Sequence, residues 1–209
     1  MAKICAIFLF LVPLASFGQV VNDSIVYLNE VDINSDPDRT IVRHQTKGKD
    51  CGYSSFGAIQ KLVGRMDDIP EGNLKAITFY FDMQPKYVNN NRFAYYQDLE
   101  MALLLYEVDS AGLPGKSIME KELRFVIDKH HKGEFTIDLN PLGIRTQKSI
   151  FIGLQAIGNM SERRIKIALK ENNKAITYYK SWDEPGWKSL SAQKYPCWFR
   201  VSLQVKKDD

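Results

Sequence analysis

The sequence predicts an all-β protein, a β-sandwich or jelly roll of about eight to ten antiparallel strands that follows an N-terminal arm. Three observations lead to this fold class. Short segments in which apolar and polar residues alternate recur roughly every ten to fifteen residues from residue 74 onward. Clusters of Gly, Pro, Asn and Asp separate these segments. Helical spacing of apolar residues competes only in residues 55–63, and one short helix there would leave the class unchanged.

Two segments carry the clearest strand patterns. Residues 74–83 place Ile77, Phe79 and Phe81 on one face, as a half-buried strand requires. Residues 98–109 are apolar on both faces, which predicts a strand that is buried on both sides or covered by a neighbouring segment. Further strands are expected at residues 122–127, 134–139, 149–156, 164–169, 175–182 and 198–205.

The loop "DSAGLPGKS", which begins at Asp109, has the composition of a turn. Gly112 can supply a positive φ, and Pro114-Gly115 matches the central pair of a type II turn. Asp109 is also a weak candidate for a calcium ligand, but this loop offers one carboxylate where strong calcium loops offer several. We therefore expect a turn here, with no metal site and no cofactor.

Residues 1–18 have the layout of a secretory signal peptide. Lys3 precedes an apolar run from Ile4 to Leu14, and small residues follow it. This run is too short to cross a membrane comfortably, and no later segment reaches transmembrane length. The predicted organisation is a signal peptide at 1–18, an N-terminal arm or edge strand with a linker at 19–50, and a β-sandwich at 51–209. We expect an exported protein that is periplasmic, associated with the outer membrane or secreted.

The charge of the chain gives no reason to expect nucleic acid as a partner. The sequence holds 28 Lys and Arg against 25 Asp and Glu, a net charge of +3. Nucleic-acid binding depends on clustered Lys and Arg that meet phosphates, and the basic groups here are short and mixed with acids.

Two cysteines, Cys51 and Cys197, lie outside the predicted signal peptide. In an oxidising compartment they could form one disulfide. They could equally be two buried thiols, and the sequence does not decide between these alternatives.

Several motifs resemble a family of exported β-sandwich proteins from Bacteroidetes-type bacteria. These motifs are "FYFDMQ", "LLLYEVDSAGLPGKSIMEKELRFVI", "GEFTIDLNPLGIRTQKSIFIGLQAIG" and "YPCWFRVSLQV". The family includes hypothetical and carboxypeptidase-regulatory-like proteins, and its layout is similar to galactose-binding-like jelly rolls. The resemblance covers residues 74–205 and implies a fold of the kind used in adhesin and carbohydrate-binding modules.

The segment "IVYLNEVDI" is similar to a run that precedes the plug domains of TonB-dependent outer-membrane receptors. It departs from the usual form at Asp32, where an apolar residue is common. The resemblance implies an envelope setting and strand addition to a partner. A plain edge strand of the sandwich is the simpler interpretation, because alternation alone explains the pattern.

No arrangement of residues in the sequence indicates catalysis. The histidines are His44, His130 and His131, and none lies near a nucleophile turn or has metal-ligand spacing. We expect His130 and His131 at the solvated tip of a hairpin. The acids that could serve glycoside cleavage are not paired by any pattern in the sequence, and they are Asp67, Asp68, Glu71, Asp138, Asp183 and Glu184.

Aromatic residues are the most suggestive candidates for ligand binding. Tyr178, Tyr179, Trp182 and Trp187 lie in one predicted hairpin, and Tyr95-Tyr96 lie in "RFAYYQD". Sugar sites combine flat rings with a few polar groups that bond hydroxyls. The alternative is that the hairpin aromatics pack against each other for stability.

These observations predict an exported, non-enzymatic binding module of the envelope or surface, whose ligand is a glycan or an envelope protein. Two alternatives remain. One is a sugar-active hydrolase, and the other is an accessory protein that docks a TonB-dependent outer-membrane receptor through residues 24–33.

Overall fold

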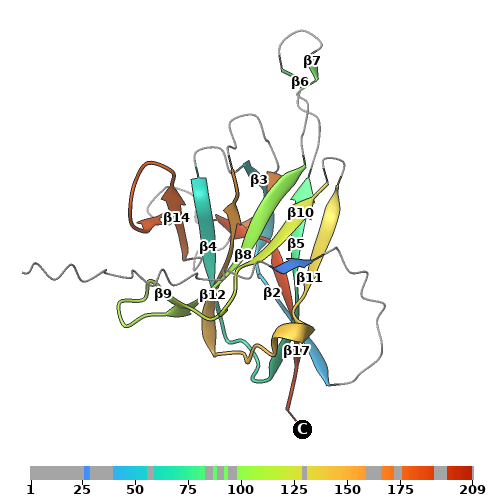
Figure 1. Cartoon of the computed structure of the whole chain (residues 1–209), viewed down its shortest axis with the longest axis vertical. Helices are drawn as coiled ribbons and strands as arrows, with labels where there is room; N and C mark the ends of the chain where they lie inside the picture. The colour runs from blue at the N-terminus through green and yellow to red at the C-terminus, as the bar shows by residue number, and fades with distance from the viewer. Residues whose placement is uncertain are drawn as a thin grey trace, which may run out of the picture.

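The protein is a β-sandwich, with two sheets packed face to face (Figure 1). The computed structural model describes residues 26–28, 40–55, 59–82, 87–88, 92–93, 98–128, 131–158, 166–171, 176–190 and 197–208. These ranges contain no α-helix. They therefore hold no long apolar helix of the kind that crosses a membrane. The all-β class predicted from the sequence is therefore confirmed. The predicted signal peptide lies outside the described residues.

The first sheet, sheet A, has eight strands in the order β1-β10-β8-β12-β4-β14-β15, with β9 paired to β8. All of its pairs are antiparallel except that between β1 and β10. Its strands are β1 (Val26–Leu28), β4 (Ile59–Asp67), β8 (Leu99–Val108), β9 (Pro114–Ser117), β10 (Leu123–Ile127), β12 (Ser149–Ala156), β14 (Thr177–Ser181) and β15 (Lys188–Ser189).

The second sheet, sheet B, has seven strands, with β5 and β13 as its most connected members. Its strands are β2 (Ile41–Gln45), β3 (Lys49–Ser55), β5 (Asn73–Asp82), β11 (Gly133–Asp138), β13 (Lys166–Glu171), β16 (Cys197–Phe199) and β17 (Val201–Lys206). A separate two-stranded ribbon joins β6 (Tyr87–Val88) to β7 (Arg92–Phe93), and one 3-10 turn, η1, spans Asn140–Leu142.

The chain passes repeatedly between the two sheets. It leaves sheet A after β4, enters sheet B at β5, returns for β8 to β10, and then changes sheet at each of β11, β12, β13 and β14. Neighbours in each sheet are therefore distant in sequence: β12 lies between β4 and β8. This connectivity is that of a jelly-roll-type sandwich and not of a simple meander.

The core fills the space between the sheets. From β5 the residues Ile77, Phe79 and Phe81 point inward, as their alternation predicts, and all three are buried. They meet the inward side chains of β8, which are Leu99, Met101, Leu103 and Leu105. Burial of these large apolar groups between two sheets is the main source of stability for such a fold.

Three sequence expectations about strands are wrong. The predicted count of eight to ten is too low, because several strands have only two to four residues. Residues 41–50, expected to belong to a linker, supply β2 and the start of β3 and pair with β17 and β13. Residues 59–63, with helical spacing, begin strand β4. Its Leu62 packs in the main core and its Val63 packs in a second cluster on the other face, so its apolar residues do not alternate strictly.

The corner between β8 and β9 is a turn, as predicted. The Oδ1 atom of Asp109 accepts hydrogen bonds from the backbone N–H groups of Ala111 at 2.9 Å and Leu113 at 2.8 Å. Gly112 has φ 78°, as expected. The predicted type II turn at Pro114-Gly115 is wrong, because Gly115 has no positive φ and both residues lie in β9.

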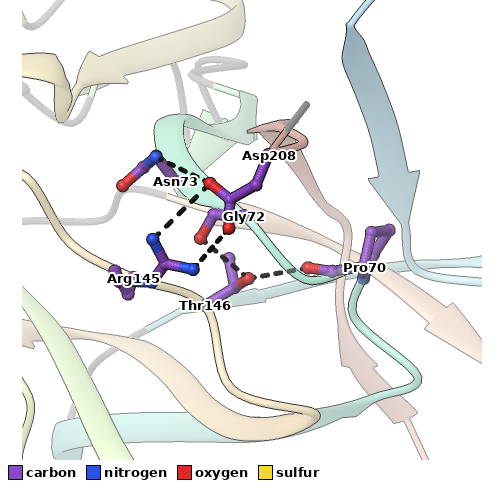
Figure 2. Close-up of polar contacts among 6 residues, drawn as sticks. All are labelled: Pro70, Gly72, Asn73, Arg145, Thr146 and Asp208. Atoms are coloured by element: carbon purple, nitrogen blue, oxygen red, sulfur yellow. Dashed lines mark hydrogen bonds and ion pairs between the residues drawn. The ribbon is translucent and has the colours of Figure 1, made fainter.

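Polar contacts tie the end of β17 to two loops at one end of the sandwich (Figure 2). The carboxylate of Asp208 pairs with the guanidinium of Arg145 and accepts a hydrogen bond from Asn73 Nδ2 at 3.4 Å. The hydroxyl of Thr146 donates to the carbonyl oxygen of Pro70 at 2.7 Å. Exposed ion pairs contribute only about 0–1 kcal/mol each, so this set mainly fixes the register of the chain end.

Gly64 lies at a close contact between the two sheets. This residue of β4 faces Trp198 of β16, and a Cβ atom at Gly64 would lie 2.2 Å from Cε3 of the indole. Trp198 is buried, with 4% of its surface exposed. A side chain at position 64 would therefore force the sheets apart or displace the indole.

We predict that Gly64→Ala destabilises the protein by about 1–3 kcal/mol, the usual cost of overpacking a core. The measurement is urea unfolding followed by tryptophan fluorescence. Gly115→Ala serves as a control, because its Cβ would meet the Asp109 side chain at 3.2 Å in an exposed corner that can adjust. Equal stability of the Gly64→Ala variant and the wild type would contradict the close contact.

Candidate functional site

The outer face of sheet A, turned away from the core, carries a second apolar cluster. Val63 of β4, Leu104 of β8 and Phe151 of β12 are buried there, on three adjacent strands. Because strand side chains alternate, these residues point opposite to the core residues beside them. Five partly buried residues pack against them, and we call all eight the outer-face cluster: Val63, Leu104, Phe151, Tyr106, Val108, Ile176, Tyr178 and Trp187.

Trp187 lies across this face from the edge of the sheet. It precedes β15, and β15 is four positions from β8 in the strand order, or roughly 19 Å at about 4.8 Å per strand. Its ring centroid nevertheless lies 5.7 Å from that of Tyr106 on β8, at 75°. The two rings therefore meet above the strands that separate β8 from β15. Tyr178 makes a similar edge contact with Phe151 at 5.7 Å.

A pocket of about 170 Å³ adjoins this aromatic surface, between β8 and the segment before β10. Tyr106 and Leu104 supply its apolar lining. Lys61 and Gln155, which pair directly across β4 and β12, supply a cation and an amide. Residues 117 and 119–122 form its opposite wall, and Glu122 is among them. The pocket thus joins an aromatic ring to several hydrogen-bonding groups.

Lys61, which lines the pocket, has a second lysine beside it on the neighbouring strand. Lys180 of β14 is the direct partner of Lys61 in the register of β14 and β4. Burial lowers the pKa of Lys61 below its ordinary value, the positive charge of Lys180 lowers it further, and Glu122 opposes both effects. Lys180 also places its ammonium 4.7 Å from the ring centroid of Trp187. Burial and the charge of Glu122 raise the pKa of Tyr106.

An ion-pair network limits the pocket on the β10 side. Arg124 of β10 pairs with Glu122 and, at 3.4 Å, with Glu100 of β8. These contacts raise the pKa of Arg124, with the Glu122 hydrogen bond as the largest cause. The guanidinium of Arg124 therefore holds the carboxylate of Glu122 in an ion pair.

The structure brings two of the four predicted hairpin aromatics together and separates the others. Tyr178 and Trp187 both belong to the outer-face cluster. Tyr179 packs instead against the main core, because it is adjacent to Tyr178 and points to the other face. Trp182 is exposed, at 41%, in the hairpin loop. Tyr95-Tyr96 lie outside the described residues.

The sequence did not single out Tyr106, Lys61, Gln155 or Glu122 as site residues. The one available signal was the apolar outer face of residues 98–109, which carries Tyr106. Lys61 and Gln155 come together only through the pairing of β4 with β12, and residue 61 precedes residue 155 by almost half of the chain. Local patterns in a sequence do not contain that register.

The two cysteines lie on strands at opposite edges of β13. Cys51 is in β3 and Cys197 in β16, and both strands pair with residues 169–171 of β13. Their Cα atoms are therefore separated by two strand spacings, about 10 Å, which is more than the roughly 7 Å that a disulfide allows. This geometry favours two cysteines that are not linked to each other. Cys51 is exposed, however, so the alternative of two buried thiols is wrong for this residue.

The structure gives His131 a different setting from the one predicted. Its ring packs edge-on against Phe135, with centroids 5.3 Å apart, and against Phe81 at 6.4 Å, so it is not at a solvated tip. His130 lies outside the described residues. Within the described ranges no group of three or more His, Cys, Asp and Glu residues could hold a metal ion. The carboxylate of Asp109, the calcium candidate, bonds the backbone of its own turn.

Three of the acids considered for glycoside cleavage, Asp67, Asp138 and Glu184, have other partners. Asp67 accepts hydrogen bonds from Arg65 at 2.8 Å and Ser149 at 2.6 Å. Asp138 accepts one from the backbone of Asn140 at 2.9 Å, before η1. The remaining acids with recorded contacts follow the same pattern, since Glu184 pairs with Lys188. These contacts explain the acids as turn and strand-end residues.

No known protein-family description matches the chain, and no curated protein matches it. Solved structures of the clostridial cysteine protease Cwp84 resemble its fold. One, after propeptide cleavage, has 13% identity and a TM-score of 0.57, over 83% of this chain and 42% of that chain. Another contains the cysteine protease and lectin-like domains of Cwp84, a surface layer associated protein of Clostridium difficile. It has 12% identity and a TM-score of 0.54, over 83% and 37%.

The chain thus spans less than half the length of these structures. At such identities the likeness defines the class of fold, a β-sandwich, and nothing of the activity.

We predict that the pKa of Lys61 responds to its two charged neighbours in opposite directions. Lys180→Gln removes a positive charge and raises the pKa of Lys61, and Glu122→Gln removes a negative charge and lowers it. The measurement is a pH titration of lysine side-chain carbon and nitrogen resonances by NMR. Lys148→Gln, in an exposed turn, is the control and leaves the Lys61 titration unchanged. A Lys61 pKa insensitive to Lys180→Gln would contradict the described pairing.

Proposed function

We propose that the protein is an exported binding module of the cell envelope or surface, without catalytic activity, and that it binds a glycan on the outer face of sheet A. The observation that carries this proposal is the combination at one pocket of an aromatic wall with an amide and charged groups. Tyr106 provides the wall, and Gln155, Lys61 and Glu122 provide the polar groups. Trp187 extends the aromatic surface beyond the pocket.

This combination suits the chemistry of sugars. A pyranose ring has C–H faces that pack on aromatic rings, and its rim carries hydroxyls that need hydrogen-bond partners. Carboxylates and carbonyl oxygens accept hydrogen bonds from hydroxyls, while amide and ammonium groups donate to them. The pocket, of about 170 Å³, is small for a ligand site, so the proposal places one sugar unit in it and the rest of a chain along the surface.

Two further observations support the proposal. The fold is similar to a structure of the cysteine protease and lectin-like domains of Cwp84, a surface layer associated protein. The first residues have the layout of a secretory signal peptide, which an envelope or surface protein needs. Export and the absence of catalysis are both part of the proposal.

The two rival functions receive less support. A hydrolase needs two carboxylates that face a substrate, and the candidate acids with recorded contacts are engaged by basic or backbone groups. Receptor docking through residues 24–33 would use a segment whose residues 26–28 already form β1 and pair with β10. That pairing is what the plain edge-strand interpretation predicts.

We predict that Trp187→Ala and Tyr106→Ala each weaken glycan binding about tenfold or more, because aromatic anchors dominate such contacts. The measurement is affinity electrophoresis in gels that contain soluble polysaccharides, followed by titration calorimetry. Tyr80→Ala is the matched control. Tyr80 is a half-buried aromatic residue of β5 in sheet B, and Arg200 covers its ring at 3.8 Å.

Thermal unfolding of each variant shows whether the fold is kept. Unchanged retention of a folded Trp187→Ala, Tyr106→Ala double variant would contradict the site. Release of reducing ends from the gel polysaccharide by the wild type would instead support the hydrolase.

A further inference from the structure

Lys61 and Lys180 form an unusual pair for a folded sheet. They are direct partners in the register of β4 and β14, and both lie on the outer face, since their neighbours Leu62 and Tyr179 pack toward the core. Like charges directly opposite on one face destabilise a sheet. Neither lysine is fully exposed, so water screens their repulsion only in part.

Several other basic side chains of the two sheets have acidic partners. Arg65 pairs with Asp67 at 2.8 Å, Lys170 of β13 with Asp50 of β3 at 3.0 Å, and Lys188 of β15 with Glu184. Arg124 has two carboxylates. Within the described ranges no ion pair involves Lys61 or Lys180, and each has the other as its direct cross-strand partner.

The negative group that acts on Lys61, Glu122, does not resolve the repulsion. Its carboxylate is paired with the Arg124 guanidinium, and Lys61 keeps a lowered pKa in spite of it. Lys180 is directed instead to the ring of Trp187, which attracts a cation without neutralising it. The free protein therefore retains two positive charges at a site that also offers an aromatic surface and an amide.

We infer that the ligand of this site is an acidic glycan, with a carboxylate or sulfate group that binds between the ammonium groups of Lys61 and Lys180. This inference rests on the proposed function and narrows its ligand class. The anion offsets the repulsion of the two lysines and accepts charge-assisted hydrogen bonds from both. The sugar ring that carries it packs on Trp187 and Tyr106, and Gln155 bonds a hydroxyl.

The test measures binding of the full chain to three polysaccharides by titration calorimetry. Polygalacturonate carries carboxylates, dextran sulfate carries sulfates, and unmodified dextran carries no charge. We expect the wild type to bind one of the two acidic polymers more tightly than unmodified dextran. The comparison of polygalacturonate with dextran sulfate identifies whether the site binds a carboxylate or a sulfate. Lys61→Gln and Lys180→Gln are each expected to lower that affinity about tenfold, the usual effect of one lost charge-assisted hydrogen bond.

Lys148→Gln is the matched control, because it removes the same charge from an exposed turn. An equal loss in this variant would show that binding follows net charge alone and would overturn the inference. Salt is expected to weaken wild-type binding more than binding by the Lys61→Gln, Lys180→Gln double variant.

A second measurement does not depend on the choice of polysaccharide. Lys61→Gln removes the like-charge pair and keeps the contact of Lys180 with Trp187, so it is expected to raise the Tm of the unliganded protein by about 1–4 °C, whereas Lys148→Gln leaves it unchanged. A residue that lowers stability but raises affinity is the mark of a binding site. A lower Tm for Lys61→Gln would contradict the repulsion on which the inference depends.

The possible failures are distinguishable. If the wild type binds unmodified dextran as tightly as the acidic polymers, and Trp187→Ala abolishes that binding, the glycan site stands and the acidic ligand is wrong. If no polysaccharide from a broad glycan panel binds, the proposed function fails together with this inference.

Discussion

The pairing of β12 with both β8 and β4 is the constraint on which the rest of the structure depends. These three strands form the centre of sheet A, and they are covered on both faces. Ile152 of β12 points into the main core, and Phe151 beside it is buried in the outer-face cluster. The strands also approach closely, since a Cβ atom at Gly153 would lie 2.0 Å from the carbonyl oxygen of Leu62. The second buried face gives the sandwich a rigid surface outside its core.

The candidate site is a consequence of that surface. Buried apolar residues hold Tyr106, Tyr178 and Trp187 in place, so little conformational freedom remains to be lost when a ligand binds. The polar groups stand one row further along the same strands, where Gln155 pairs with Lys61 and Lys61 with Lys180. A regular sheet thus positions aromatic and charged groups at fixed spacing, and loops are needed only to close the pocket.

Much of the fold could be predicted because its signals are local. Alternation in residues 74–83 located β5 almost to the residue, the regular spacing of short apolar segments located β12 at residues 149–156, and turn residues marked the corner at Asp109. Residues 59–67 were not predicted as a strand because a strand that is buried on two faces has no strict alternation. The apolar residues of this segment matched helical spacing by chance. Residues 41–50 were not predicted as strands because β2 and β3 are polar edge segments that depend on pairing with distant strands.

The site could be predicted only in part for the same reason. Tyr178 and Trp187 lie on one hairpin, so their proximity follows from the turn between them. The cross-strand pair of Lys61 and Lys180 requires the register of β4 with β14, which no local pattern contains.

The central claim is that the outer face of sheet A receives the ligand. Its most direct test is NMR chemical-shift mapping of backbone amides and of the Trp187 indole while a bound polysaccharide fragment is titrated. The structure predicts that the largest changes fall on β4, β8, β12 and β14 around Lys61, Tyr106 and Gln155. Changes confined to sheet B, or to the loops at the end of the sandwich near Asp208, would contradict it.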